Sequence, residues 1–526
     1  MLVQTTMRPQ ELSNLLHKCK SKKHLNQIHT QILTSNFSDH TLLLTRLLFV
    51  YALAEYGCLC HADLIFRRIP NPNTYTWSTM IRAHAVGSTP WRALTLYKDM
   101  HSCGPMPDQR AIPFALMACS RLRDLAYGTC VHSHKVKLGL STSLYIHNAL
   151  INMYASFRRL DCAGKVFDEM TQRDVVSWNA LITGYVRWGE LDSARSLFGE
   201  MRERNVISWN AMITGFVQAG RAKEALGLFH EMQKMGVVNS DKITMASVIS
   251  ACSSLGALDF GIWVHGYVER NQIELDMVIR TSLVDMYAKC GSIERAFRVF
   301  DEMPKRDVYA WTVMISGLSM HGRAKEALEL FREMFHSGTR PNEATFVAVL
   351  CACTHGGLVE EGRECFRVMR EVYGLEPQAQ HYACMVDLLS RVGLIDEAEQ
   401  LVTGMPIEPD VFIWGALLAG CKMHGRVKLG ESIAERLLAL EPQSHAFYVL
   451  LSNIYAKANR FDDVKRIRGM MRENGIKKIP GCSSIEVDGH LYEFSVNSMP
   501  ESLMKEIEPV LLELSGKMKL GAMFQT

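Results

Sequence analysis

Apolar residues between positions 175 and 205 fall on two stripes with the spacing of an α-helix, and Gly189 separates the stripes. Residues three and four apart share one face of a helix, so each stripe predicts an amphipathic helix and the glycine predicts the turn between them. The segment is therefore expected to form a helical hairpin. The first stripe consists of Trp178, Leu181, Ile182, Tyr185 and Val186, and the second of Leu191, Ala194, Leu197, Phe198 and Met201.

This pattern recurs along most of the chain at intervals of 31 to 36 residues. The segment "SWNALITGYV" from Ser177 is followed 31 residues later by "SWNAMITGFV" from Ser208. One hairpin cannot bury both of its apolar stripes, so neighbouring hairpins must stack and share a continuous core. The expected fold class is all-α, a superhelical solenoid of stacked helical hairpins. Hairpins are expected to start at residues 41, 74, 109, 144, 175, 206, 242, 277, 308, 343 and 379, with a degenerate unit at 9–40 and a related one from 411.

Composition supports a folded, soluble chain without identifying a partner. The 526 residues are 48% hydrophobic, which is enough to build buried cores over most of the length. The net charge of +3 permits nucleic-acid binding but does not require it. The longest apolar run, from Leu47 to Ala54, is too short to cross a bilayer, and no signal-peptide core opens the chain. The first 38 residues are basic, which is compatible with import into an organelle.

Fifteen cysteines and a His-x-His segment raise the question of a metal site, but their spacing favours core packing. No Cys-x-x-Cys spacing occurs. His132 and His134 lie two apart on a predicted helix, where side chains face apart, so a shared metal is not expected. Four cysteines occupy the eleventh position of their units, which suits a small buried side chain. These four are Cys119, Cys252, Cys353 and Cys421.

The segment "GLVEEGR", from Gly357, has the glycine spacing of a phosphate-binding loop, but Arg363 stands where that loop needs lysine. Because it occupies the slot between the two helices of a hairpin, a hairpin turn is expected. Glu360 and Glu361 then lie in the first turn of a helix, where negative charge is favourable, and are expected to be solvated. No Ser/His/Asp or Cys/His grouping indicates catalysis, and neither a metal nor a cofactor is expected.

Two polar positions recur through the array. The fifth residue of many units is Asn, Ser or Thr, and the last residue of the same units is Asp or Asn. Asp and Asn before a helix are common N-caps, so capping alone explains any one unit about as well as a binding role. Recurrence at both positions favours a second role. The pairs are Thr45 with Asn73, Ser78 with Asp108, Asn148 with Asp174, Asn179 with Asn205, Asn210 with Asp241, Thr281 with Asp307, and Thr312 with Asn342.

The residue types at these positions suit the edges of nucleic-acid bases. Uracil and guanine present a ring N–H, which the acceptor-only carboxylate of Asp matches. Adenine and cytosine present a ring acceptor, to which the amide of Asn can donate. A choice between Asn and Ser or Thr at the fifth position can then separate pyrimidine from purine. Units of this length occur in peptide-binding tetratricopeptide repeats and in RNA-reading pentatricopeptide repeats, and the polar positions favour the second class.

Several segments resemble the plant pentatricopeptide repeat family, in its PLS subfamily, over nearly the whole chain. "DKITMASVISACSSLGALDFGIWVHGYVERNQI" resembles its L units, "TSLVDMYAKCGSIERAFRVFDEM" its S units, and "AWTVMISGLSMHGRAKEALELFREMFHSGTRPN" a P unit. "YVLLSNIYAKANRFDDVKRIRGMMRENGIKKIPGCSSIEV" resembles the second half of its E region. "IEVDGHLYEFSV" alternates apolar residues around Asp488 and Gly489, which predicts a β-hairpin, and resembles the short E+ extension.

The resemblance implies a right-handed superhelical solenoid of four parts. An N-terminal segment with a degenerate repeat would span 1–40, the repeat array 41–410, the E region 411–487, and a short E+-like tail 488–526. The cytidine deaminase domain that the family often carries needs an H-x-E and a C-x-x-C for zinc, and this sequence has neither. Any editing would therefore use a deaminase supplied by another protein.

By the family's pairing rule, seven units are expected to contact one base each. The footprint implied is 5'-A G n U Y U n G A n n-3', in the order of the seven pairs. Pro113, Ala246 and Val347 stand at the fifth position of the L units, where their side chains cannot hydrogen-bond, so these units are expected to be spacers. Ala383 leaves the last S unit without an assigned base.

The function expected from the sequence is sequence-specific binding of organellar single-stranded RNA, by a non-enzymatic site-recognition factor for C-to-U editing. The E region would recruit a deaminase and accessory editing proteins, and no membrane partner is expected. Two alternatives stay open: an RNA stability or splicing factor, and a protein-binding helical-repeat scaffold. The expected compartment is the mitochondrion, with the chloroplast as the alternative.

Overall fold

The computed structural model describes residues 8–35, 37, 39–140, 143–236, 240–477, 481–487, 490–495, 509–513 and 515. The chain forms two compact units. The first unit comprises Met1–Ala219 and Leu228–Asn239, and the second Gly220–Gly227 and Ser240–Thr526. None of the helices in the described ranges is long and apolar enough to span a bilayer.

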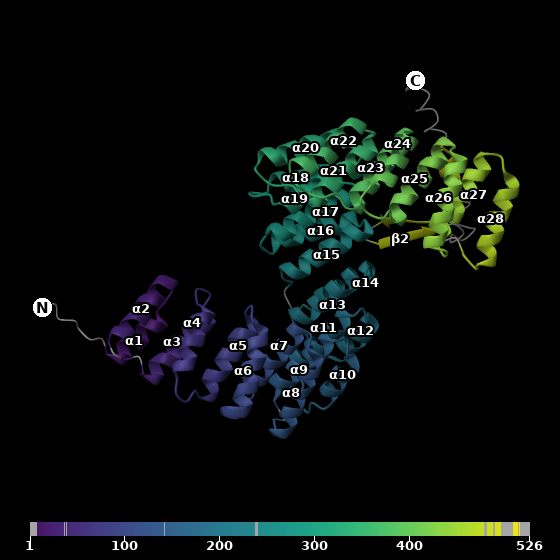
Figure 1. Cartoon of the computed structure of the whole chain (residues 1–526). Helices are drawn as coiled ribbons and strands as arrows, with labels where there is room; N and C mark the ends of the chain where they lie inside the picture. The colour runs from purple at the N-terminus through teal and green to yellow at the C-terminus, as the bar shows by residue number, and fades with distance from the viewer. Residues whose placement is uncertain are drawn as a thin grey trace. The chain divides into compact units, whose positions relative to one another are not determined.

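Helices of the first unit follow one another as hairpins (Figure 1). They are α1 (Pro9–His17), α2 (Lys22–Thr34), α3 (Thr41–Leu53), α4 (Leu59–Arg68), α5 (Thr74–Val86), α6 (Pro90–Cys103), α7 (Ala111–Leu122), α8 (Leu125–Lys137), α9 (Leu144–Ser156), α10 (Leu160–Asp168), α11 (Val175–Arg187), α12 (Leu191–Glu200) and α13 (Val206–Gln218). Helix α14 (Ala222–Met235) has residues in both units.

The second unit continues the same architecture and contains two strands. Its helices are α15 (Lys242–Leu255), α16 (Leu258–Arg270), α17 (Met277–Lys289), α18 (Ile293–Asp301), α19 (Val308–Met320), α20 (Ala324–His336), α21 (Glu343–Gly356), α22 (Val359–Glu371), α23 (Ala379–Val392), α24 (Ile395–Gly404), α25 (Val411–His424), α26 (Val427–Leu440), α27 (His445–Lys457) and α28 (Phe461–Glu473). Strands β1 (Cys482–Val487) and β2 (His490–Ser495) pair antiparallel, with Val487 opposite His490. The predicted turn residues Asp488 and Gly489 lie outside the described residues.

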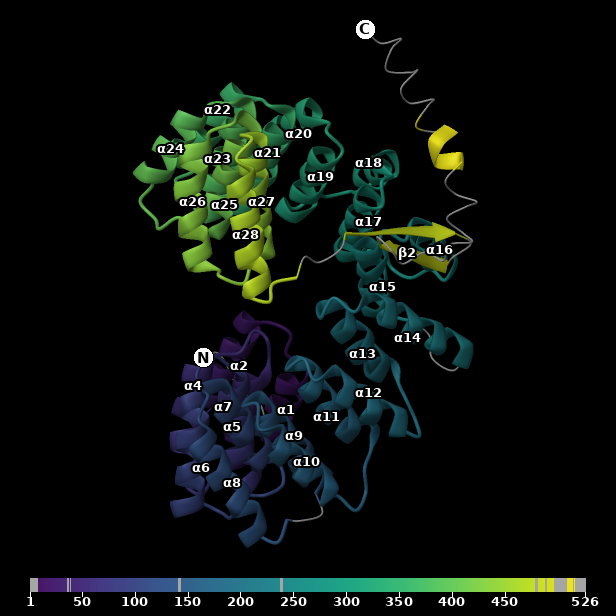
Figure 2. The same cartoon turned by 90° about the vertical axis from the view of Figure 1, so that its right-hand side faces the viewer.

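Within each unit, the first helix of a hairpin packs against the first helix of the next. In the first unit, α5 contacts α7, α7 contacts α9 and α9 contacts α11. In the second unit, α21 contacts α23, α23 contacts α25 and α25 contacts α27, and the four helices follow one another in chain order in Figure 1. Figure 2 shows the same helices turned by 90°. Buried apolar residues form a continuous cluster from Leu12 to Leu181 in the first unit and another from Tyr382 to Ile476 in the second. The predicted all-α solenoid of stacked hairpins is therefore confirmed.

Counting the units expected at 9 and 411, the first helix begins at the predicted residue in twelve of thirteen units, among the helices that the structure describes. The exception is the unit expected at 109, where α7 begins at Ala111. Its first two residues form a turn instead, because a carboxylate oxygen of Asp108 accepts hydrogen bonds from the backbone N–H groups of Arg110 at 3.0 Å and Ala111 at 3.1 Å. Local side-chain bonds of this kind delay entry into the helix.

Glycines end the first helices as predicted. Gly189 has a φ of 79° and Gly393 a φ of 97°, in the left-handed region that favours residues without a Cβ. The segment from Gly357 is likewise a turn, with a φ of 65° at Gly357. Glu360 and Glu361 after it are exposed in the first turn of α22, as expected.

The four cysteines predicted to be buried lie in the core, and the two histidines contact different helices. All four cysteines at the eleventh position are fully buried, and burial raises the pKa of the Cys119 and Cys421 thiols to about 12. His132 is hydrogen-bonded through Nδ1 to the hydroxyl of Tyr154 at 2.9 Å, whereas Nδ1 of His134 lies 3.4 Å from the hydroxyl of Tyr97. The two rings therefore face different neighbouring helices. Across the described ranges, no group of three His, Cys, Asp or Glu residues is placed to hold a metal.

Candidate nucleic-acid interface

The last residue of nearly every paired unit is the N-cap of the next unit's first helix. Its side-chain oxygen Oδ1 accepts a hydrogen bond from the backbone N–H three residues later, which satisfies one of the free donors at the helix start. Capping is therefore a real role of these residues. The distances are 2.9 Å for Asn73, 2.8 Å for Asp174, 3.0 Å for Asn205, 2.9 Å for Asp241, 2.9 Å for Asp307 and 3.0 Å for Asn342.

Capping uses only one of the two terminal atoms of each side chain. In Asn205, Oδ1 accepts from the backbone N–H and the hydroxyl of Ser208 and from the amide of Asn179. Because the cap requires an acceptor, the carbonyl oxygen must face the helix and the amide nitrogen must be the other atom. Within the described part of the chain, Nδ2 of Asn73, Asn205 and Asn342 has no hydrogen-bond partner. An Asn cap therefore leaves a donor available, and an Asp cap leaves a second acceptor oxygen.

Stacking of neighbouring hairpins places the side chain of a unit's fifth residue within hydrogen-bond distance of the side chain of its last residue. The hydroxyl of Ser78 donates to Oδ1 of Asp108 at 3.2 Å, across 30 residues of sequence. Nδ2 of Asn179 donates to Oδ1 of Asn205 at 3.2 Å. Ser78 is 5% exposed and Asn179 is 8% exposed, so neighbouring residues restrict the position of both side chains. In both units the fifth residue donates to the same Oδ1 atom that accepts the backbone N–H groups, so it helps to fix the orientation of the last residue.

In a third unit, the side chain of Thr345 links the fifth and last residues. The hydroxyls of Thr312 and Thr345 are 2.8 Å apart. The Thr345 hydroxyl donates in turn to Oδ1 of Asn342 at 2.9 Å. The two residues are thus joined through one intervening group and not directly.

Asp174 shows the electrostatic consequence of such contacts. Burial raises the pKa of its carboxyl, but hydrogen bonds from Ser177 and from the side chain of Asn148 outweigh burial and hold that pKa below its ordinary value. Hydrogen bonds to a carboxylate favour its charged form. Asp174 is therefore ionised at neutral pH and can only accept hydrogen bonds.

Two predicted pairs are not joined by a hydrogen bond between described residues. The hydroxyl of Thr45 donates to the backbone carbonyl of Thr41 at 2.8 Å, and Thr281 bonds to the carbonyl of Met277 in the same way. Asn73 and Asp307, their partners in the sequence pattern, act as caps only. The hydroxyl of a threonine inside a helix often donates to a backbone carbonyl of the preceding turn, and this bond competes with a bond to the last residue of the unit.

The pair of Asn210 and Asp241 is divided between the two units of the chain. Asn210 is 8% exposed on α13, and Asp241 caps α15. Pro113, Ala246, Val347 and Ala383, the fifth residues of other predicted units, lie in first helices and are half-buried there.

The second residue of many first helices is apolar and exposed, which the repeat pattern did not predict. It lies three positions before the fifth residue, on the same helix face. The sequence could have indicated this surface, because these apolar residues lie outside the buried stripe of the helix, where packing between hairpins does not require them. These residues, 44 to 77% exposed, are Leu42, Tyr75, Tyr145, Val176, Ile207, Ile243, Val278, Tyr309 and Phe412.

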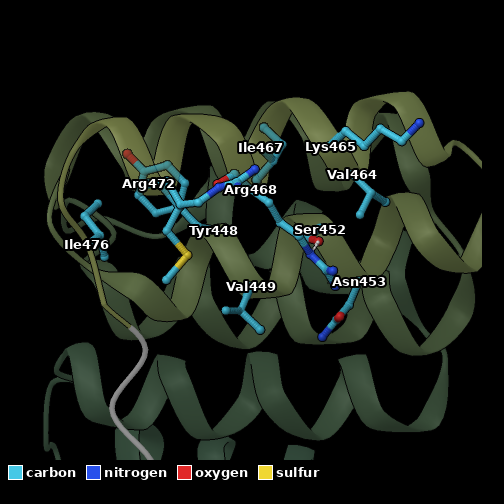
Figure 3. A pocket seen from close by; sticks show the side chains of 11 residues that line it. Tyr448, Val449, Ser452, Asn453, Val464, Lys465, Ile467, Arg468, Arg472 and Ile476 are labelled. Atoms are coloured by element: carbon cyan, nitrogen blue, oxygen red, sulfur yellow. Dashed lines mark hydrogen bonds between the residues drawn. The ribbon is translucent and has the colours of Figure 1, made fainter.

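The last hairpin carries a groove of about 720 Å³ between α27 and α28 (Figure 3). Lys465, Arg468 and Arg472 line it from one face of α28, together with apolar side chains from both helices. Nε of Arg468 donates to the hydroxyl of Ser452 at 3.2 Å. Among the described residues, neither Arg468 nor Arg472 has a carboxylate partner, whereas Arg460 at the start of α28 pairs with Glu431 at 2.7 Å. The groove is therefore basic and partly apolar.

Sequence comparisons match the units found in the structure. A family model described as PPR repeat matches residues 75–105, 145–175, 176–206, 278–308 and 344–372. A PPR repeat family model matches 204–254 and 306–355, and an E motif model matches 424–486.

Curated relatives are similar along most of their length. A mitochondrial pentatricopeptide repeat-containing protein of Arabidopsis thaliana is 38% identical over 93% of this chain and 88% of its own. A chloroplastic one is 40% identical over 95% and 82%, and the chloroplastic protein CRR2 is 35% identical over 94% and 71%. Among solved structures, the pentatricopeptide repeat protein PPR10 from maize is 16% identical, with a TM-score of 0.49 over 90% of each chain.

Proposed function

The chain belongs to the pentatricopeptide repeat family, and from this premise we propose that it binds single-stranded RNA of a plant organelle in a sequence-specific manner. The observation that carries the proposal is the meeting of fifth and last residues, seen at Ser78 with Asp108 and at Asn179 with Asn205. Such a pair presents one oriented polar atom per unit beside an exposed apolar side chain.

The chemistry of one unit follows from these parts. The cap holds Oδ1 of the last residue against the helix, so base choice rests on the remaining atom: an acceptor in Asp or a donor in Asn. The exposed apolar residues of successive units, such as Val176 and Ile207, supply surfaces on which the faces of an unstacked base can pack. The fifth residue determines how much room the base has and holds the last residue in place through its hydrogen bond.

The proposed footprint is 5'-A G n U Y U n G A n n-3'. Units with an Asn at the fifth position take a pyrimidine and units with Ser or Thr take a purine. The units whose fifth residue is Pro113, Ala246 or Val347 are spacers that contact the RNA without selecting a base.

Within this function, the finer role we favour is site recognition for C-to-U RNA editing. Support comes from the match of residues 424–486 to the E motif and from the resemblance of 411–487 to the family's E region. The chain is non-enzymatic in this proposal and recruits a deaminase through that region, where the basic groove between α27 and α28 offers a surface. The relatives named mitochondrial and chloroplastic support an organelle, and the mitochondrion is our choice.

The test is selection from a randomised pool of single-stranded RNA by the purified chain, followed by sequencing of the retained molecules. Enrichment of a motif close to A-G-n-U-Y-U-n-G-A is expected. A folded chain that enriches no motif would contradict RNA reading and favour the protein-binding scaffold.

A second measurement separates editing from other RNA roles. In a plant lacking the protein, organellar RNA sequencing is expected to show loss of editing at one or more cytidines downstream of the footprint. Retained introns or lost transcripts with editing intact would assign the chain to splicing or RNA stability.

A further inference from the structure

Three of the seven last residues follow an arginine that makes the same contacts in each unit. Nε of Arg173, Arg204 and Arg306 donates to the backbone carbonyl of a phenylalanine at the end of the preceding helix, at 3.1, 3.0 and 3.1 Å. The guanidinium also lies over the ring of that phenylalanine, with its Cζ atom 4.4, 4.7 and 4.4 Å from the ring centroid. The phenylalanines are Phe167, Phe198 and Phe300.

Each phenylalanine also packs against the tryptophan in the following first helix. The centroid distances are 4.8 Å for Phe167 and Trp178, 4.8 Å for Phe198 and Trp209, and 5.1 Å for Phe300 and Trp311. The Arg–Phe–Trp cluster thus ties together the helix before the loop and the helix after it. The last residue of the unit lies at the end of that loop, next to the arginine.

The physical effect of the arginine is to close the loop. The last carbonyls of a helix lack partners within the helix, and a cation there is favoured by the helix dipole. A guanidinium can bond those carbonyls and stack on an aromatic face at the same time. In the loop of Arg204, Nη2 also reaches the carbonyls of Phe198 at 2.9 Å and Gly199 at 3.1 Å.

Other units place proline at the same position. Pro72, Pro107 and Pro341 directly precede Asn73, Asp108 and Asn342. Proline fixes φ through its ring and so restricts the loop without any side-chain contact. Before α15, Ser240 precedes Asp241, so this position has neither an arginine nor a proline.

One proline loop matches an arginine loop in length. The loop before α5 spans residues 69–73 and the loop before α13 spans residues 201–205, five residues each. The aromatic contact is also shared, because the ring centroids of Phe66 and Trp77 are 4.8 Å apart. Both loops end in Asn, and the residue before it is Pro72 in one and Arg204 in the other.

From this alternation we infer that Arg173, Arg204 and Arg306 are positioning residues for base selection. Each holds the loop so that the free atom of the next residue, a donor in Asn205 and an acceptor in Asp174 and Asp307, has a fixed place. Proline does the same in the other units. The inference rests on the proposed RNA-reading function.

The competing role for these arginines is direct contact with phosphate, which would carry no base preference. Their geometry argues against it, because the donors already bond carbonyls and the side chains of Arg173 and Arg306 are only 33% and 26% exposed. The two roles also predict different effects of salt. Loss of a phosphate contact makes the RNA affinity depend less steeply on salt concentration, whereas loss of a positioning contact does not.

The experiment compares Arg204→Ala with Arg204→Pro and with the control Arg202→Ala, an exposed arginine two residues away in the same loop. Each full-length variant is titrated with RNAs that differ only at the nucleotide facing the pair of Asn179 and Asn205. Arg204→Ala is expected to reduce the preference for pyrimidine at that nucleotide about fivefold and to leave preferences at other nucleotides unchanged. Arg204→Pro should restore most of the preference, and Arg202→Ala should keep it.

Amide hydrogen exchange of residues 201–208 gives a readout that needs no RNA. Faster exchange in Arg204→Ala and wild-type exchange in Arg204→Pro are expected, because only the first variant loosens the loop. If Arg204→Pro restored neither base preference nor slow exchange, the inference would be overturned. It would also be overturned if Arg204→Ala weakened binding to all RNAs equally and made the affinity depend less steeply on salt concentration. If the wild-type chain itself shows no base preference, the proposed function fails and this inference fails with it.

Discussion

The hairpin at residues 175–205 and the hairpin at residues 343–378 have the same helical scaffold but offer different groups to a ligand. Both follow a capping side chain, Asp174 in one and Asn342 in the other, and both turn at a glycine with positive φ. At the fifth position the first has Asn179, bonded to Asn205, and the second has Val347. Folding and recognition therefore use different positions of one helix, so the two can be changed separately.

The largest expected effect comes from breaking what the two hairpins share. Ile182, 0% exposed, and Leu350, 1% exposed, fill equivalent buried positions, the eighth of their first helices. Ile182→Ala and Leu350→Ala should each destabilise the fold by about 2–5 kcal/mol, because each leaves a cavity in the core. Urea denaturation followed by circular dichroism measures this. A loss confined to one of the two variants would contradict a common scaffold.

The next effect is a change of base preference without loss of fold. Replacing both Asn148 and Asp174, as Asn148→Thr with Asp174→Asn, should move the preference of that unit from U towards A by about tenfold or more, because a donor replaces an acceptor beside a shorter fifth residue. Binding to RNAs with each base at the facing nucleotide measures the shift. The cap of α11 survives, since Asn caps as well as Asp. An unchanged preference would contradict the assignment of one base to one unit.

A single substitution makes the first hairpin resemble the second. Asn179→Val should reduce base preference at one nucleotide about fivefold, because Asn205 loses the group that braces it. Stability should change little, since Oδ1 of Asn179 is buried without a hydrogen-bond partner among the described residues. The matched control is Ala246→Val, which changes size at the fifth position of a spacer unit. If Ala246→Val reduced base preference equally at the nucleotide that faces Asn179 and Asn205, a special role for Asn179 would be refuted.

The smallest effect is on stability in acid. The folded-state pKa of Asp174 lies below its ordinary value of 3.8, so its ionised form stabilises the fold above the unfolded pKa. That contribution is lost as the pH falls through the folded pKa, at and below about pH 4. Asp174→Asn keeps the cap but does not titrate, so its unfolding midpoint should fall less steeply with acid than that of the wild type. Identical acid profiles would show that the contacts of Asp174 add no stability.

Helix boundaries were largely predictable because they depend on neighbours in sequence. The apolar stripe from Trp178 to Val186 and the glycine at 189 are local signals, and α11 and its turn follow them. The start of α7 was not predicted, because the carboxylate of Asp108 bonds the two N–H groups after it and forms a turn. That choice depends on one side chain and leaves no trace in the periodicity.

The candidate interface was predictable in part. The recurrence of Asn, Asp, Ser and Thr at two positions identified Asn179 and Asn205, although their bond spans 26 residues. Periodicity could not tell that Thr45 and Thr281 return their hydroxyls to their own helices. The exposed apolar residues at the second position, such as Tyr309, looked like ordinary helix residues until burial was known.

By itself, the sequence determined the helices, their turns, the repeat length and the residue types at the two polar positions, because each depends on contacts within one turn or one hairpin. Tertiary structure alone decided which polar residues meet, which apolar residues stay exposed, and how Arg204 closes its loop over Phe198. Those outcomes depend on how one hairpin stacks on the next. Stacking sets distances between side chains that are about thirty residues apart, as between Ser78 and Asp108.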